Sequence, residues 1–395
     1  MKPRFYAFLA IISSIFISLH AEACAPLKNP CTIYDFRGKV TGGLAAGGVI
    51  LGQKGTLYGE TVNGGTFPCT ATHGESGYGC GTVYSLSKVG GYKVLVSFHG
   101  PNGAFGASTL TLIGNTLYGT TERGGSGQNG VIFAVNTDGS NFTLLHQFFG
   151  PDGSNPIGPL VSGPNGILYG ITGAGGPGFP GQNPGVLFSI GLNGKYTILH
   201  KFSESNGENP NTLVMTPSGI LVGGTNIGGP TDPNYCPQGC GVVFSFDPST
   251  SQYSVLKSYV GGTGGDPYIG SAGPDDTIYG NDEDLFSITL SGNYQVLAIS
   301  NFYISGNTPA SGPILAPNGK IFGTYTQSLG GGTVYSYDPS NPGVLNASCN
   351  FGSAGSRAGT TPASQPILAP NGDLVGTTEE TGNNPVSGAI YDCTP

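Results

Sequence analysis

The sequence is poor in charged residues, histidine and methionine, and it has no tryptophan. Only 9% of its 395 residues are charged, and 14 Lys and Arg stand against 22 Asp and Glu, a net charge of −8. The basic residues are scattered, whereas binding to a phosphate backbone requires them in clusters. No basic amphipathic segment is present for contact with an anionic membrane. These absences exclude nucleic acid and a charged membrane surface as partners.

Long hydrophobic runs are scarce too. The one such run, residues 5–19, follows a basic start and precedes the small-residue site Ala21-Glu22-Ala23, a pattern typical of a secretory signal peptide. The run is shorter than the roughly 20 residues that cross a bilayer. We therefore predict a signal peptide over 1–23, no transmembrane segment, and a secreted, extracellular or periplasmic protein. A lipid anchor at Cys24 is less favoured, because Ala21 stands where that signal usually carries Leu.

Glycine and proline are abundant, with 71 and 30 copies. Without periodicity, this level would indicate disorder. However, 20 Tyr, 20 Phe and the low charge favour a large buried core. A short phrase also recurs seven times, strongly in four copies and weakly in three: Leu57-Tyr58-Gly59, Leu117-Tyr118-Gly119, Leu168-Tyr169-Gly170, Ile278-Tyr279-Gly280, Leu221-Val222-Gly223, Ile321-Phe322-Gly323 and Leu374-Val375-Gly376.

One repeat, residues 159–202, shows the expected local structure. It contains four short apolar runs, and the turn signals Pro164-Asn165-Gly166 and Leu192-Asn193-Gly194 separate the first two and the last two. Such turns join antiparallel strands, so one repeat predicts a four-stranded meander. Successive repeat glycines lie 43 to 60 residues apart, which is the size of a β-propeller blade.

The third strand of each repeat carries one aromatic residue at the same position. We expect these side chains to pack between adjacent blades, and the repeat glycine to permit close approach of the neighbouring sheet. The seven aromatics are Tyr84, Phe133, Phe188, Phe244, Phe286, Tyr335 and Tyr391.

The two ends of the chain complete each other. The seventh repeat stops after its third strand, "GAIYDCTP", while "CTIYDFRGK" near the N-terminus resembles the fourth strands of other repeats. Strand 31–37 thus supplies the missing strand and leaves no open edge for aggregation. We predict one all-β domain over 24–395: a monomeric seven-bladed β-propeller of four-stranded blades, closed by this N-terminal strand. A β-solenoid is the structural alternative, but its coils are usually shorter and it needs no spare strand.

The eight cysteines are an even number in an exported chain, which indicates disulfides. Two pairs lie within single loops. A third pair would lock the closing strand to the last blade, and the two cysteines left over would form the fourth. Cys236 and Cys240 resemble half a zinc site, but no second pair accompanies them, so we expect no metal there. The predicted pairs are Cys69 with Cys80, Cys236 with Cys240, Cys31 with Cys393, and Cys24 with Cys349.

The repeat resembles the GloVer (Gloeobacter/Verrucomicrobia-type) repeat of exported bacterial proteins, the choice-of-anchor tandem repeat family. The matching segments are "GILYGITGAGGPGFPGQNPGVLFSI", "NTLYGTTERGGSGQNGVIFAV" and "GTLYGETVNGGTF...GCGTVYSL". The fifth repeat departs, with Asn281-Asp282-Glu283-Asp284 where the family has Thr-Thr and Gly-Gly. The resemblance implies export and a propeller-like repeat, and it transfers no catalytic residues. The absence of tryptophan separates this chain from the Trp-Asp and quinone-dependent dehydrogenase propellers.

Function is expected where the repeats differ. The loops between second and third strands vary most, over 60–80, 171–184 and 224–240, and variable loops on a rigid scaffold usually carry binding. We therefore predict a secreted binding module, without a cofactor, for an extracellular glycan or a surface protein.

A catalytic alternative rests on carboxylates. His146 and His200 occupy equivalent repeat positions, so we interpret them as structural. Glu60, Glu122 and Glu379 follow repeat glycines in adjacent blades, and acids at one rim could act as the acid and base of a glycan hydrolase or lyase. Solvated surface carboxylates are the simpler interpretation, and the sequence leaves open whether the protein is an enzyme.

The acidic run of the fifth repeat offers a weak calcium hypothesis. Asp282 and Asp284 could supply oxygen ligands to Ca²⁺. Because the spacing matches no regular ligand pattern, a solvated acidic turn is favoured over a metal site.

Overall fold

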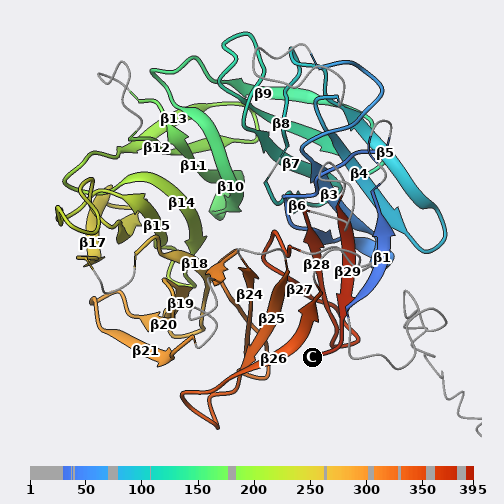
Figure 1. The fold of residues 1–395 in the computed structure, drawn as a ribbon. Helices are drawn as coiled ribbons and strands as arrows, with labels where there is room; N and C mark the ends of the chain where they lie inside the picture. Colours follow the sequence, from blue (N-terminus) through green and yellow to red (C-terminus); the bar gives the residue numbers. More distant parts are fainter. Residues whose placement is uncertain are drawn as a thin grey trace, which may run out of the picture.

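The computed structural model describes residues 30–36, 38, 41–69, 79–106, 108–176, 184–261, 265–300, 307–327, 331–352, 361–379 and 388–395. Within these ranges the chain forms seven small antiparallel sheets arranged in a ring (Figure 1). The predicted seven-bladed β-propeller is therefore confirmed. The regular strands follow from the short apolar runs, and the glycine and proline between them end each strand after a few residues.

Each sheet is one blade, and the strands of each blade are given in order from the central axis outward. Blades 1 to 4 consist of β2 (Ile50–Leu51), β3 (Leu57–Thr61), β4 (Thr82–Ser87) and β5 (Gly91–Ser97); β6 (Thr111–Ile113), β7 (Thr116–Thr121), β8 (Val131–Asn136) and β9 (Thr143–Gln147); β10 (Ser154–Ser162), β11 (Ile167–Ala174), β12 (Val186–Gly191) and β13 (Tyr196–Lys201); and β14 (Glu208–Met215), β15 (Leu221–Ile227), β16 (Val242–Asp247) and β17 (Gln252–Ser258).

Blades 5 to 7 complete the ring, and the first strand of blade 6 is split into two segments that both pair with its second strand. They consist of β18 (Tyr268–Ala272), β19 (Ile278–Asn281), β20 (Leu285–Ile288) and β21 (Tyr294–Ala298); β22 (Asn307–Pro309), β23 (Ile314–Leu315), β24 (Ile321–Gln327), β25 (Gly332–Tyr337) and β26 (Leu345–Phe351); and β27 (Ile367–Leu368), β28 (Leu374–Thr378), β29 (Ala389–Cys393) and β1 (Cys31–Asp35).

The closing strand lies where the chain ends predict it. β1 pairs antiparallel with β29 and is the outermost strand of blade 7, so residues from both ends of the chain share one sheet (Figure 1). This pairing closes the ring with hydrogen bonds.

The third-strand aromatics are all fully buried between blades, as predicted. The role of the repeat glycine differs from the expectation, however. Gly170 lies opposite Phe188 in the register of β11 and β12, and a Cβ atom at Gly170 would overlap the Phe188 ring. The glycine thus makes room for the aromatic ring of its own blade. The same overlap with the blade's own aromatic would occur at all seven repeat glycines.

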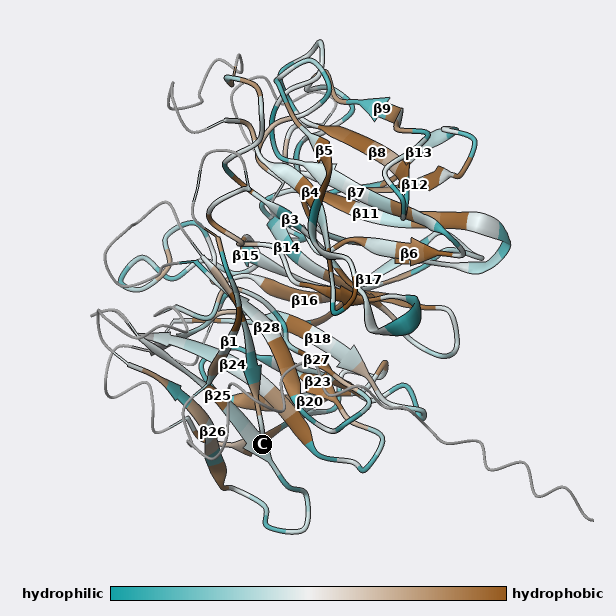
Figure 2. Cartoon of the chain, turned by 90° about the vertical axis from the view of Figure 1, so that its right-hand side faces the viewer, coloured by the Kyte–Doolittle hydropathy of each residue, from teal (hydrophilic) through white to brown (hydrophobic). Residues whose placement is uncertain are grey.

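A second set of contacts joins neighbouring blades at their outer strands. His146 of β9 stacks on Tyr196 of β13 with 4.0 Å between ring centroids, and His200 of β13 stacks on Tyr253 of β17 at 3.8 Å. The next blade replaces the histidine with Lys257, whose Nζ lies 4.1 Å from the Tyr294 ring centroid. The two histidines therefore serve blade packing. Apolar residues gather along strands such as β8, β16 and β20, and polar residues along the connections (Figure 2).

The disulfides differ from the prediction at the ring closure. Cys393 is bonded to Cys349 of blade 6, so the predicted pairs of Cys31 with Cys393 and of Cys24 with Cys349 are wrong. The reason is the strand register: Cys31 lies opposite Asp392, and successive side chains of a strand point to opposite faces. Cys393 consequently faces blade 6. Cys31 is also disulfide-bonded, and Cys24 lies outside the described residues.

Candidate binding site on the loop-rich face

The loops between second and third strands start with a shared hydrogen-bonding device. In blade 3, the Thr172 hydroxyl accepts a hydrogen bond from Val186 N at 3.1 Å and donates one to Ala174 O at 2.9 Å. Thr61 and Thr225 make the same two bonds in blades 1 and 4. In these three blades, the threonine two residues after the repeat glycine therefore fixes both ends of the loop.

The Gly-Gly pair of the repeat fastens the loop to the preceding blade connection. Gly175 and Gly176 have φ of 77° and 121°, values that favour glycine. Gly176 N donates to Gly150 O at 2.9 Å, and a Cβ atom at Gly175 would overlap backbone atoms of the same connection. The recurring phrase thus encodes a rigid base for the loop-rich face.

Blade 5 departs from this pattern. Asp282 takes the place of the threonine, and its carboxylate accepts hydrogen bonds from Asp284 N at 3.3 Å and from the Tyr294 hydroxyl at 2.7 Å. The Asp284 carboxylate accepts one from Ser300 N at 2.7 Å. Asp282 is only 3% exposed, and burial raises the pKa of its carboxyl.

The calcium hypothesis receives no support from this arrangement. Both candidate carboxylates, Asp282 and Asp284, are already hydrogen-bonded within the turn, and Asp282 is buried. Within the described residues, no group of three or more His, Cys, Asp or Glu side chains is placed to hold a metal ion.

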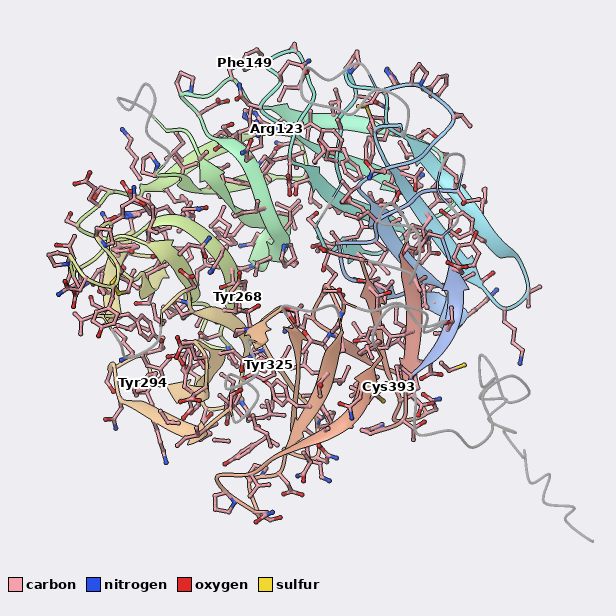
Figure 3. The ribbon with its side chains drawn as sticks, in the orientation of Figure 1. Arg123, Phe149, Tyr268, Tyr294, Tyr325 and Cys393 are labelled. Carbon is pink, nitrogen blue, oxygen red and sulfur yellow. A yellow bond between two sulfur atoms is a disulfide. The ribbon has the colours of Figure 1, made fainter. Side chains whose placement is uncertain are left out.

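A cavity of 760 Å³ opens where the short loop of blade 5 adjoins the long loop of blade 4. Tyr268, at the start of β18, lies toward the centre of the ring, whereas Tyr294 lies toward its periphery (Figure 3). The lining comes from blades 4, 5 and 6: Asn226, Ile227, Tyr235, Cys236, Pro237, Gln238, Gly239, Cys240, Gly265, Asp266, Tyr268, Asp282, Glu283, Thr308 and Pro309.

The blade 4 wall of the cavity is held by covalent and backbone bonds. A disulfide joins Cys236 to Cys240. Asp232 and Cys236 exchange two backbone hydrogen bonds of 3.1 and 2.9 Å, and Gln238 O accepts one from Gly228 N at 2.9 Å. Tyr235, at the tip of this turn, is 71% exposed. The wall therefore presents an aromatic side chain on a preorganised loop.

The blade 5 side contains two non-glycine residues with left-handed backbone. Asp266 has φ of 48° and Glu283 has φ of 117°. Contacts hold both: Asp266 N donates to Cys240 O at 3.3 Å, and the Tyr325 hydroxyl donates to Glu283 O at 3.0 Å. Asn155 and Asn209, at the positions equivalent to Asp266 in blades 3 and 4, have the same left-handed backbone. The conformation of Asp266 therefore belongs to the repeat, whereas Glu283 lies in the short turn of blade 5.

The cavity offers a consistent set of chemical groups. Tyr235 and Tyr268 provide aromatic faces and hydroxyl groups, and burial together with the Asp266 charge raises the pKa of Tyr268, so its hydroxyl keeps its proton. Asn226 and Gln238 provide amides, and Asp266 and Glu283 provide carboxylates. The described lining residues include no Lys, Arg or His.

Glu60, the first of the predicted catalytic carboxylates, does not lie at the rim. Its side chain is fully buried and faces blade 2, where Ser108 Oγ donates to Oε2 at 3.4 Å. Among the described residues, Oε1 has no hydrogen-bond partner. Burial raises the pKa of Glu60 well above its usual value. An exposed acid and base pair that includes Glu60 is therefore not formed.

The other two candidates lie at loop bases. Glu122 N donates to Phe105 O at 3.1 Å and Glu379 N donates to Thr361 O at 2.9 Å, and both side chains are partly buried. Burial raises the pKa of Glu122, and the Arg123 charge opposes that rise. Neither residue lines the 760 Å³ cavity.

The remaining long loops are described in part. Cys69 is bonded to Cys80 in blade 1, and residues 70–78 and 177–183 lie outside the described residues, as does the predicted signal peptide. The sequence reasoning did not single out Asp266, Tyr268, Tyr235 or Gln238. One signal was available: Asp266-Pro267 stands where the connections into blades 3 and 4 carry Asn155-Pro156 and Asn209-Pro210, so a carboxylate replaces an amide at this position.

Comparisons with solved structures show the fold. The chain is similar to virginiamycin B lyase from Staphylococcus aureus, with 13% identity, a TM-score of 0.57, and coverage of 92% of this chain and 98% of that one. It is similar to an oligogalacturonate lyase solved with manganese, with 13% identity, a TM-score of 0.54, and coverage of 92% and 90%.

A third similar structure is the extracellular domain of a hybrid two component system from B. thetaiotaomicron, with 11% identity and a TM-score of 0.58. The match covers 91% of this chain and 39% of that one, so the chain spans well under half the length of that extracellular domain. No curated protein matches the sequence. Across the part of the chain that the structure describes, no helix is long and apolar enough to cross a membrane.

The family comparison agrees with the repeat phrase and its structural roles. The model of the Gloeobacter/Verrucomicrobia repeat matches residues 28–236, which is more than half of the chain. The protein therefore belongs to the Gloeobacter/Verrucomicrobia repeat family.

Proposed function

We propose that this protein is an exported binding module that takes an extracellular glycan into the cavity between blades 4 and 5. The observation that carries the proposal is the 760 Å³ cavity with aromatic, amide and carboxylate groups on a rigid frame. Ligand sites are typically concave, largely preformed, and furnished with a few polar groups that fix orientation.

The groups present suit a carbohydrate. The Tyr235 ring can lie against the apolar face of a sugar ring, and the Gln238 and Asn226 amides can pair with hydroxyl groups. Asn226 Oδ1 accepts a hydrogen bond from Asn211 at 2.6 Å, which orients its amide donors. The disulfides support the exported location, because they persist in oxidising compartments.

Catalysis on the glycan is the less supported alternative. Of its three predicted carboxylates, Glu60 is enclosed between blades 1 and 2 and none lines the cavity. The similarity to lyases lies below 15% identity and concerns the fold. The protein is therefore expected to bind the glycan without cleaving it.

The test exposes the purified chain to a panel of immobilised extracellular polysaccharides and measures retained protein and released oligosaccharides together. We expect retention of at least one polysaccharide, with no released products. The variant Tyr235→Ala should lose retention, whereas Phe149→Ala should keep it, since Phe149 is a similarly exposed aromatic, 59% against 71%, away from the cavity (Figure 3). Absence of retention on every polysaccharide would contradict the proposal.

A further inference from the structure

The charge inside the cavity is one-sided. Asp266 and Glu283 line it, and none of the described lining residues is basic. Among the described residues, neither carboxylate takes part in a side-chain hydrogen bond or an ion pair. The two ion pairs found there, His146 with Asp152 and Lys320 with Asp338, involve neither residue. The two cavity carboxylates thus remain available to a ligand.

The third acid of the cavity has a different role. The Asp282 carboxylate accepts hydrogen bonds from the Tyr294 hydroxyl and from the backbone of the turn. It therefore stabilises the wall of the cavity, and Asp266 and Glu283 are the carboxylates that can contact a ligand. Lys257, the only Lys or Arg among the described residues of blades 4 and 5, lies over the rings of Tyr259 and Tyr294 at 4.6 and 4.1 Å. It is engaged in blade packing and is not among the lining residues.

The aromatic groups add a second preference for positive charge. A cation is attracted to the face of a tyrosine ring when it lies within about 6 Å, and two tyrosines line this cavity. Carboxylates also bind an ammonium group through charge-assisted hydrogen bonds, which are about twice as strong as neutral ones. A neutral sugar could donate hydroxyl hydrogen bonds to the same carboxylates, but without the positive charge that strengthens the bonds of an ammonium group.

Building on the proposed function, we infer that the cavity selects glycans that carry free, protonated amino groups, the oligosaccharides of unacetylated amino sugars. The ammonium group lies against Asp266 and Glu283, and the sugar ring lies against Tyr235. Acetylation of the amine removes its charge and enlarges the group, so an N-acetylated chain is expected to bind more weakly than the free amine.

The experiment compares two hexasaccharides that differ only at nitrogen, one of glucosamine and one of N-acetylglucosamine. Binding of each to the full chain is measured by titration calorimetry at about pH 6. This pH lies below the ordinary pKa of amines and well above that of carboxylic acids, which leaves room for the upward shift that burial causes in the pKa of Asp266. We expect the glucosamine chain to bind at least ~10-fold more tightly, as a charge-assisted hydrogen bond predicts.

The double variant Asp266→Asn with Glu283→Gln should abolish this preference. The matched control, Asp275→Asn with Asp276→Asn, changes the net charge equally in the β18–β19 turn on the opposite face. It should preserve the preference, which separates local recognition from general attraction to an acidic protein. Thermal unfolding of both variants checks that the fold is kept.

The outcomes are distinguishable. Equal affinity for both hexasaccharides overturns the amine preference and leaves the proposed glycan binding intact. Loss of preference in the opposite-face control also overturns it, because the charge then acts at a distance. Absence of binding to any glycan overturns both proposals. Binding of a lysine-rich peptide without binding of the glucosamine chain replaces the glycan with a protein ligand and overturns both as well.

Discussion

Blades 3 and 5 have the same interior and different loop-rich faces. In each, the third-strand aromatic, Phe188 or Phe286, is fully buried over the repeat glycine. At the loop-rich face, residues 175–185 separate the second and third strands of blade 3, with Thr172 just before them, whereas only residues 282–284 separate these strands in blade 5. Asp282 substitutes for the threonine there, and its carboxylate satisfies the turn and the Tyr294 hydroxyl.

The difference shows which parts of the repeat are free to vary. The interior is constrained because each blade packs against two others, and interior packing tolerates little change in volume. The loop base must satisfy its buried backbone groups, but either a hydroxyl or a carboxylate can do so. Shortening the blade 5 loop removes one neighbour of the long blade 4 loop, and the cavity lies at this junction.

The largest expected effect tests the shared interior. Phe188→Ala should lower the free energy of unfolding by about 3–5 kcal/mol, because it removes a buried ring and leaves a cavity. Phe286→Ala in blade 5 should cost a similar amount. Urea unfolding measures both. A cost below about 1 kcal/mol for either variant would show that the two blade interiors are not equivalent.

A second test compares two disulfides. Removing the Cys349–Cys393 bond, which links blades 6 and 7 and spans 44 residues, should cost about 4 kcal/mol by loop entropy. Removing the Cys236–Cys240 bond, which spans 4 residues, should cost about 2 kcal/mol. Serine pairs at each site and urea unfolding measure the difference. If both serine pairs lower the free energy of unfolding by the same amount, Cys349–Cys393 does not stabilise the ring more than Cys236–Cys240 stabilises its own loop.

Sequence reasoning predicts the ring well because each repeat carries its own evidence. Three patterns are visible in the sequence: the Leu-Tyr-Gly phrase, the aromatic residue in the third strand of all seven repeats, and the matching segments near the two ends of the chain. Only a closed seven-bladed ring accounts for all three. The prediction that Cys31 pairs with Cys393 was wrong, because the pairing depends on the face of β29 to which each side chain points. A shift of one residue along the strand reverses that face.

The candidate site was harder to predict for a related reason. Its residues come from three blades and lie side by side only after the ring has closed. Single substitutions, such as Asp266 at the position of Asn155 and Asn209 in blades 3 and 4, are weak signals in the sequence. Glu60 shows the reverse error. Its position one residue after Gly59 suggested the rim, but alternation along β3 directs its side chain toward blade 2.

A smaller effect tests the exchange of threonine for aspartate. Asp282→Ala should cost about 2 kcal/mol, because it leaves the Tyr294 hydroxyl and the Asp284 N–H without their partner. Thr172→Ala, which leaves one backbone N–H unpaired, should cost about 1 kcal/mol. The measurement is urea unfolding at neutral pH. A larger cost for Thr172→Ala would contradict the stronger role of the carboxylate.

The smallest expected effect is a pH-dependent change in stability at the residue directly after the repeat glycine, which is Glu60 in blade 1 and Asn281 in blade 5. Asn281 of blade 5 accepts a hydrogen bond from the Tyr335 hydroxyl at 2.8 Å and donates to Ser311 O at 3.1 Å. The equivalent Glu60 faces Phe133, which has no hydroxyl. Because burial raises the pKa of Glu60, the folded protein retains a proton that the unfolded chain loses. The contribution of Glu60 to stability therefore falls as pH rises above about 4.5.

Glu60→Gln removes this titration, so the variant and the natural chain should differ least near pH 4 and increasingly, in favour of the variant, toward pH 8. Melting temperatures across this range measure the gap. Asp282 also has a raised pKa and titrates in the same direction, so some decline should persist in the variant. Glu204→Gln, at an exposed position, is the control and should follow the natural chain. If the melting temperatures of Glu60→Gln and of the natural chain stay the same distance apart at every pH, the Glu60 carboxylate is solvated or paired in the folded protein. Glu60 would then be hydrogen-bonded between blades as Asn281 is.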